Sequence, residues 1–229
     1  MTLLIFDAGP IISLTTNNVL WILEELKVKS QVQFAITAGV KRELVDKPLE
    51  TLRFKFEAVQ VQQLIERGVL QVIDDERVAA RAQELLGLAN RILEAQGVKI
   101  QIMQRGEMET IAASALLRAD AIVVDERVTR TLLESPEQVQ KLMEKRLHMQ
   151  LKIDRSALHA FEEQTRHISL IRSVELVTVA FEKGVLNKFI VKIPNARREL
   201  LESLLWGLKL NGCSVTDDEI NAIVKAEKL

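Results

Sequence analysis

Two acidic residues each follow directly on a short apolar run, a position that suits chemistry at the edge of a β-sheet. Asp7 comes after the run LLIF, and Asp125 comes after AIVV. Two further acids lie in helical sequence beside predicted strands, Glu43 in the stretch VKREL and Glu107 in the stretch GEMET. Open parallel sheets bind their ligands at the carboxyl ends of the strands. We therefore expect all four side chains to meet at one edge of the sheet.

Four carboxylates in one pocket repel each other, and this repulsion predicts a bound cation. Two like charges about 4 Å apart repel by ~4 kcal/mol at an effective dielectric constant of 20. Either the pKa values of the acids rise, or a divalent cation neutralises them. Mg²⁺ and Mn²⁺ prefer carboxylate and water ligands and bind phosphate oxygens readily. A cation held in this way can activate water for attack on a phosphodiester.

Alternating strand and helix patterns over the first 150 residues predict the elements that position these acids. Apolar runs predict strands at 1–6, 33–36, 69–73 and 121–124, and an alternating pattern predicts one more at 147–153. Apolar residues at helical spacing predict helices at 11–26, 52–66, 77–96 and 106–118, with another opening near 135. Thr37 is expected to cap a short helix, and Gly97 to end the helix at 77–96. The order is typical of an α/β fold with a parallel sheet.

The second part of the chain is predicted to be helical from Asp154 onward. A last helix is expected to open at Thr216, with Glu219 as its capping-box partner. The other helices of this part are predicted at 171–183 and 195–210. We divide the chain into an α/β domain at 1–153 and a helical C-terminal extension at 154–229 packed on it.

Composition narrows the class of protein. The 229 residues hold 31 Lys plus Arg and 32 Asp plus Glu, so the formal net charge is −1. A polybasic nucleic-acid binder is excluded, because such binding needs an excess of positive charge. The single Cys213 excludes disulfides within the chain, and no apolar run reaches the ~18 residues of a membrane span. We expect a cytoplasmic protein that does not enter the membrane.

Four segments of the sequence resemble the motifs of one known family. The stretches LLIFDAGPIISL, VKREL, GEMETIAASA and IVVDERVTR, in that order, look like the four acidic motifs of the PIN-domain ribonucleases. They are most similar to an archaeal and bacterial branch related to the VapC-type toxins. The resemblance covers residues 1–135 and extends to a later helix at 172–186. It implies a three-layer α/β/α fold and cleavage of RNA with Mg²⁺ or Mn²⁺.

The resemblance assigns a role to four acids. Asp7, Glu43, Glu107 and Asp125 match the family's quartet, which is catalytic and binds the metal ion. Glu107 is preferred over Glu109, because its position 18 residues before Asp125 matches the family's connection from helix to strand. Glu109 also points about 200° away from Glu107 around a helix.

Other residues near the quartet are expected to contribute more weakly. Glu126 follows the last acid and is a candidate accessory metal ligand, at a position where the branch often has Asp. Arg127 and Arg130 either hold phosphate or form a solvated helix face. Ser13 and Ser173 are candidate contacts to the substrate or to ligated water.

Three further patterns have a simpler structural interpretation. His159, Glu163 and His167 share one helix face, but zinc sites draw their ligands from more than one segment, so we expect surface residues. Phe54 and Phe56 either form part of an apolar core stripe, which we favour, or stack on bases beside Arg53 and Lys55. Cys213 is expected to be a small packing residue.

The sequence therefore predicts a metal-dependent endoribonuclease that hydrolyses RNA phosphodiester bonds. The alternative is a PIN-like module that binds RNA or a protein without turnover. The motifs of other enzyme classes are absent from the sequence: it has no GxGxxG after the first strand, no Walker lysine and no nucleophile elbow. The resemblance further implies a homodimer and an antitoxin-like protein partner.

Overall fold

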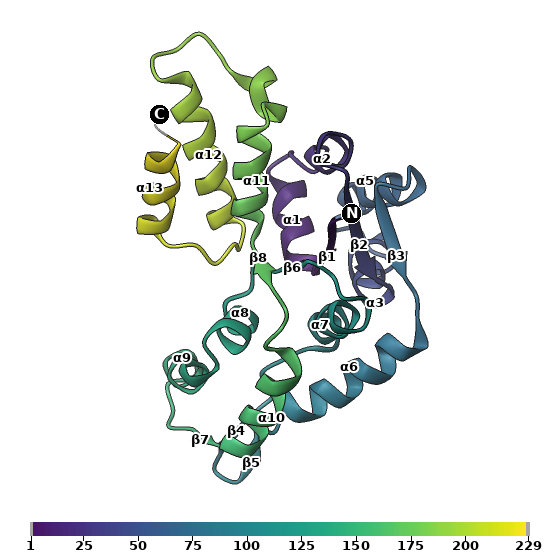
Figure 1. Cartoon of the computed structure of the whole chain (residues 1–229), viewed down its shortest axis with the longest axis vertical. Helices are drawn as coiled ribbons and strands as arrows, with labels where there is room; N and C mark the ends of the chain where they lie inside the picture. Colours follow the sequence, from purple (N-terminus) through teal and green to yellow (C-terminus); the bar gives the residue numbers. More distant parts are fainter. Residues whose placement is uncertain (1, 228–229) are drawn as a thin grey trace.

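The computed structural model describes residues 2–227 and contains a parallel sheet of five strands in the order β3-β2-β1-β6-β8 (Figure 1). The strands are β1 (Thr2–Phe6), β2 (Val32–Thr37), β3 (Leu70–Ile73), β6 (Ala121–Val123) and β8 (Leu170–Ile171). The chain thus has an α/β fold, and the strands predicted between residues 1 and 124 are confirmed. The strand β8 lies in the part of the chain predicted to be helical, and it corrects that prediction.

Alternate residues of β1 face opposite sides of the sheet, and helices cover both sides. Leu4 and Phe6 pack into one hydrophobic cluster, while Ile5 packs into the other. The first cluster includes residues of α1 (Ala8–Thr16), α2 (Ile22–Ser30), α5 (Lys55–Glu66) and α11 (Ser173–Glu182). The second includes residues of α6 (Glu76–Ala89), α7 (Arg105–Leu117), α8 (Arg127–Glu134) and α10 (Arg155–Thr165). Burial on both faces explains why the central strands read as continuous apolar runs.

The C-terminal helices extend the first cluster and have no separate core. Leu201 and Leu205 of α12 (Ala196–Leu210) and Ile220 of α13 (Asp217–Ala226) belong to it. The short 3₁₀ helix η3 (Val185–Phe189) connects α11 to this pair. Figure 1 shows α11, α12 and α13 side by side, with α1 next to α11. The predicted capping box is confirmed, because the Thr216 hydroxyl accepts the amide of Glu219 at 3.2 Å.

A β-hairpin replaces the end of the helix predicted at 77–96. The helix α6 ends at Ala89, and the antiparallel strands β4 (Leu93–Ala95) and β5 (Val98–Lys99) follow. Gln96 and Gly97 join them with positive φ angles of 51° and 82°, the pattern of a type I′ turn. Gly97 is therefore a hairpin residue and not a helix terminus.

Two other predicted elements are shorter than expected. Only β7 (Lys152–Ile153) remains of the strand predicted at 147–153, because α9 (Val139–Leu147) occupies its start; β7 pairs with β4 outside the main sheet. The helix predicted at 11–26 is divided into α1 and α2 near Asn18, whose φ is 56°. Among the residues that the structure describes, no helix has both the length and the apolar character to cross a membrane.

The segment after β2 changes helix type twice, from α to π and back to α. Thr37 caps α3 (Ala38–Lys41), as predicted, by accepting the amide of Val40 at 3.3 Å. A π-helical turn, η1 (Arg42–Asp46), follows and leads into α4 (Lys47–Leu49). Such π turns are rare and occur frequently at functional sites. The remaining short helix, η2 (Pro136–Gln138), connects α8 to α9.

Candidate functional site

Asp7 and Asp125 follow two neighbouring strands at the centre of the sheet. Phe6 of β1 pairs with Val123 of β6, and the amide of Asp7 donates to the Val123 carbonyl at 3.0 Å. Both side chains are buried, Asp7 at 7% and Asp125 at 2% exposure. A Cβ built on Gly9 would lie 3.7 Å from Asp7 Oδ2 and 3.8 Å from Asp125 Cβ. Gly9, in the first turn of α1, therefore lies close to both acids.

The electrostatic environment of Asp7 couples it to two other acids of the predicted quartet. The pKa of Asp7 is raised to about 6: burial is the main cause, the carboxylates of Glu43 and Asp125 add to it, and the amides of Ala8 and Gly9 act against it. These amides belong to the first turn of α1, where a helix favours negative charge. Burial and like charge together outweigh this effect, so Asp7 takes up a proton far more readily than a free aspartate.

Glu107 lies in the first turn of α7, where it caps the helix and also lies close to other acids. Its Oε2 accepts the amide of Gln104 at 2.8 Å, and its Oε1 accepts the hydroxyl of Thr129 at 3.4 Å. Burial raises its pKa to about 7; the nearby Asp7 and Glu126 also raise it. The contact with Gln104 is an ordinary helix cap. The proximity of two other acids is not needed for capping, and it places Glu107 in the same acidic group as Asp7.

Glu43 reaches the acidic group from the π-helical turn η1. Its side chain is exposed, and a Cβ built on Gly106 would lie 3.6 Å from its Oε2. Gly106 directly precedes Glu107 in α7, so Glu43 faces the turn that carries another candidate acid. Together with its influence on Asp7, this contact brings all four predicted acids to the carboxyl edge of the sheet.

Two further acids near the quartet have partners of their own. Glu126 caps α8 by accepting the amide of Thr129 at 2.8 Å, and it forms an ion pair with Arg146 at 3.3 Å. Glu109 is buried, and it accepts the amide of Gly39 at 2.9 Å and the guanidinium of Arg105 at 3.0 Å. Glu109 thus joins α7 to the start of α3, on another side of the helix from Glu107.

The acids share one edge of the sheet without forming a closed set of metal ligands. Within residues 2–227, no three His, Cys, Asp or Glu side chains lie close enough together to hold a metal ion as they stand. The donor chemistry nevertheless fits Mg²⁺ or Mn²⁺, because both prefer oxygen ligands and Mg²⁺ keeps several of its waters. A cavity of about 420 Å³ opens beside Glu107 and Glu126, with Gln101, Met103 and Arg146 among its other walls.

Ser173 positions Asp125. Its amide donates to Asp125 Oδ1 at 2.8 Å, and its hydroxyl donates to Oδ2 at 2.7 Å. Ser173 is fully buried, and so is Ser13, whose hydroxyl donates to the carbonyl of Asn211 at 3.4 Å. Both serines thus have partners within the protein, and contact with the substrate or with ligated water stays a prediction. The sequence pattern shows a small polar residue, but not the partner that buries it.

Arg130 joins α8 to the loop before α13. Its guanidinium donates to the carbonyl of Ser214 at 2.6 Å and pairs with Glu134 at 3.2 Å. Arg127 is exposed, and both arginines line a cavity of about 310 Å³ with Thr216. Of the two candidate phosphate contacts, Arg127 is thus the more accessible one.

Sequence reasoning missed that the C-terminal loop closes over Asp125. The amide of Ser214 donates to the Asp125 carbonyl at 3.0 Å. Burial, together with the charge of Asp125, raises the pKa of the neighbouring Cys213 to about 12. Arg172 is buried between Glu175 and Glu219 and donates to the Ser214 carbonyl at 3.1 Å. Apart from the local pair of Arg172 with Glu175, no local pattern predicts these contacts, since they join residues 42 to 89 positions apart in the sequence.

Three other predictions have clear outcomes. Phe54 and Phe56 are 54% and 71% exposed, so the prediction that they form part of a core stripe is wrong. His159 and Glu163 lie exposed on α10, 3.6 Å apart. Cys213 is buried in the first hydrophobic cluster, which confirms that it packs there.

Comparison with protein-family models, with curated proteins and with solved structures finds no match to this chain. The functional argument therefore depends on the site itself. Asp7, Glu43, Glu107 and Asp125 gather where an open parallel sheet binds its ligands. Such a set of acids can attract a divalent cation, and an acid with a pKa near neutrality can also accept a proton from water.

Proposed function

We propose that this chain is an Mg²⁺- or Mn²⁺-dependent endoribonuclease of the PIN type. The observation that carries the proposal is the gathering of the four acids at one edge of the sheet, where two of them, Asp7 and Glu107, have raised pKa values. Glu43 and Asp125 raise the pKa of Asp7, and Asp7 raises that of Glu107. Such clusters of acids with raised pKa values are more frequent at functional sites than elsewhere. The order of the four motifs along the chain, which is similar to that of the PIN family, supports RNA as the substrate.

Each acid has a distinct part in the proposed site. With pKa values of about 6 for Asp7 and about 7 for Glu107, both acids are partly protonated near neutral pH, and a bound cation would favour the loss of these protons. Asp125 is kept in one orientation by Ser173, and Glu107 by Gln104. Glu43 approaches from the exposed side and completes the group. A bound divalent cation would supply charge neutralisation and Lewis-acid activation of water.

The charge of the chain supports a nucleic-acid substrate once the site is considered separately. The formal net charge is −1, and without the four acids the remaining chain carries +3. The exposed Arg127 lies near the acids in sequence, two residues after Asp125. A mildly basic surface around an acidic, cation-binding group suits a phosphodiester substrate. A homodimer and an antitoxin-like partner remain predictions that depend on the resemblance alone.

A specific observation favours the second candidate, a PIN-like module that binds RNA or a protein without turnover. No three candidate ligands within the described residues are grouped closely enough for a metal ion. Both carboxylate oxygens of Asp125 also already accept hydrogen bonds from Ser173. If cation binding does not draw the acids together, the edge of the sheet remains a binding surface.

Cleavage of a labelled single-stranded RNA with Mn²⁺, and with EDTA in its place, separates the two candidates. We expect cleavage with Mn²⁺ only, and at least a 100-fold loss in Asp7→Asn and Asp125→Asn. The matched control is Asp74→Asn, because Asp74 also follows a strand of the sheet, β3, but is exposed and is not among the acids that raise the pKa of Asp7. Binding without cleavage by the wild type supports the second candidate. Equal cleavage by the wild type and both site variants rules out the proposed ribonuclease site.

A further inference from the structure

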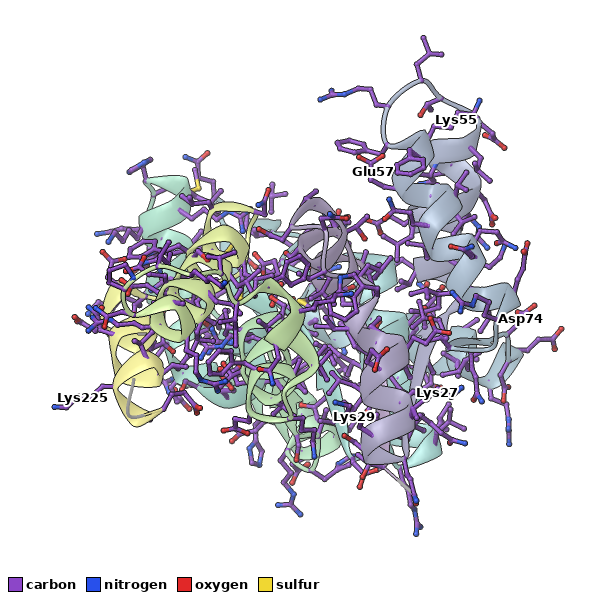
Figure 2. All side chains as sticks on the ribbon, turned by 90° about the horizontal axis from the view of Figure 1, so that it is seen from above. Lys27, Lys29, Lys55, Glu57, Asp74 and Lys225 are labelled. Carbon is purple, nitrogen blue, oxygen red and sulfur yellow. The ribbon has the colours of Figure 1, made fainter. Side chains whose placement is uncertain are left out.

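Residues 49–56, here called the arm, expose apolar side chains to an unusual extent. Phe54 and Phe56 are more than half exposed, and Leu52 is 96% exposed. Figure 2 shows the segment marked by Lys55 and Glu57 projecting from the rest of the molecule. Side chains of this kind are normally buried, and an exposed apolar cluster marks an interaction site.

Phe54 holds a backbone conformation that bulky residues rarely adopt. Its φ is 60° and its ψ is 20°, in the left-handed region, at the start of α5. For a bulky residue this conformation is a strained exception, and such strain is concentrated at functional positions. The guanidinium of Arg53 lies 5.4 Å from the centre of the Phe54 ring, so the exposed ring carries a cation beside it.

A cavity joins Phe54 of the arm to Glu43, one of the four candidate acids. Its volume is about 230 Å³, and its mainly apolar walls include Ile12 and Thr16 of α1, together with Phe54. Glu43, one of the four candidate acids, forms part of the same wall. A strand of nucleic acid that reaches the acids over this side of the site would therefore pass the Phe54 ring.

We propose that the arm is a stacking platform for unpaired bases of single-stranded RNA; the substrate class rests on the proposed function. Arg53, Phe54, Lys55 and Phe56 alternate cations with rings. Single-stranded nucleic acids bind to such surfaces through backbone contacts with the cations and base stacking on the rings. The apolar walls of the cavity suit a base and not a phosphate. A protein partner could bind to Leu52 equally well. Binding of a protein would not explain why cations and rings alternate at residues 53–56, or why Phe54 and Glu43 line the same cavity.

Replacement of the rings by leucine tests the proposal, because leucine remains apolar but cannot stack. Binding of a short fluorescent single-stranded RNA, and of the same sequence as a duplex, is measured in EDTA so that no probe is cleaved. We expect Phe54→Leu and Phe56→Leu each to weaken single-strand binding about fivefold to 100-fold, and Phe54→Trp to retain it. Duplex binding is expected to change little. Phe189→Leu is the matched control, because Phe189 is also exposed beside a lysine, Lys188, but lies outside the arm.

The outcomes separate this inference from the proposed function. Wild-type affinity in both leucine variants overturns the stacking platform, and Mn²⁺-dependent cleavage in the same preparation leaves the ribonuclease intact. No RNA binding by the wild type overturns both. If the wild type is a dimer in size-exclusion chromatography, and Phe56→Ala is a monomer with unchanged affinity for RNA, the arm is a protein interface. Circular dichroism verifies that each variant is folded. Because the Phe56 side chain is exposed, its replacement is not expected to disturb the fold.

Discussion

Ser173 supplies hydrogen bonds to both oxygens of the Asp125 carboxylate, from its amide at 2.8 Å and from its hydroxyl at 2.7 Å. The two residues are 48 positions apart, and the pairing of β6 with β8 brings them together. Both are buried, so the carboxylate has one orientation, set by the first residue of α11. A candidate acid of the central sheet is thus positioned by a residue that follows it in the chain after three α-helices, α8, α9 and α10.

Ser173→Ala is expected to affect stability and activity together. The change leaves the amide contact but removes the hydroxyl partner of a buried carboxylate, which typically costs ~1–3 kcal/mol. We expect the free energy of unfolding in urea to fall by about this amount. The rate of RNA cleavage is expected to fall about tenfold or more, because Asp125 Oδ2 is no longer held.

Ser203→Ala is the matched control, since the hydroxyl of Ser203 is exposed and bonds only within α12, to the Leu200 carbonyl. We expect this variant to match the wild type in both measurements. A Ser173→Ala protein with unchanged stability and unchanged cleavage would show that the hydroxyl does not position Asp125.

Glu107 and Glu109 are expected to separate activity from stability. Glu107→Gln keeps an oxygen for the Gln104 amide but removes the charge, so we expect loss of cleavage with little change in stability. Glu109→Ala removes the buried acceptor of the Gly39 amide, so we expect a stability loss of ~1–3 kcal/mol. Its cleavage rate per folded molecule is expected to be retained. The reverse pattern in urea unfolding and cleavage assays would assign the catalytic position to Glu109.

The pH dependence of stability is expected to depend on Asp7. Its folded pKa of about 6 lies above the value of an unfolded aspartate, ~3.9, so the native state binds the proton more tightly between these pH values. The contribution of Asp7 to stability is therefore highest below pH ~4 and falls as the pH rises to ~6. Above that, its burial costs up to ~3 kcal/mol, because one pKa unit corresponds to ~1.4 kcal/mol.

Asp7→Asn isolates this effect from the other titrating groups. In EDTA, we expect the variant to be more stable than the wild type at pH 8 and to show no such gain at pH 4. Urea unfolding of both proteins at the two pH values gives the comparison. If the variant is less stable than the wild type at pH 8, the ionised Asp7 carboxylate stabilises the folded state and does not destabilise it.

The features that could be predicted from the sequence are those that local patterns determine. An apolar run followed by Asp7 or Asp125 identifies a buried strand and the acid at its end, and the capping box at Thr216 marks a helix start. Long-range partners were not predictable, because nothing near Ser173 indicates that it bonds Asp125. The strand β8 was missed because two residues are too few for an alternating pattern. Gly97 was misassigned because a glycine serves a helix end and a type I′ turn equally well.

Gly9→Ala is expected to stabilise the fold and impair the site. Gly9 lies in α1, where alanine favours the helix by up to ~1 kcal/mol over glycine. Its new methyl group would stand at ordinary contact distance from Asp7 Oδ2 and from Asp125 Cβ, and so beside both acids. We expect equal or higher stability in thermal unfolding, together with slower RNA cleavage and a weaker stabilisation by Mn²⁺.

The matched control for this change is Gly87→Ala. Gly87 is also helical, in α6, and a Cβ built there meets no atom within 4 Å. The two substitutions therefore make the same change in helix propensity, and only the one at Gly9 adds atoms beside the acids. Gly87→Ala is expected to gain stability with wild-type cleavage and Mn²⁺ stabilisation. If Gly9→Ala does the same, the space beside Asp7 and Asp125 at Gly9 is not used by cation or substrate, and the site must be placed on another side of the carboxylates, toward Glu43.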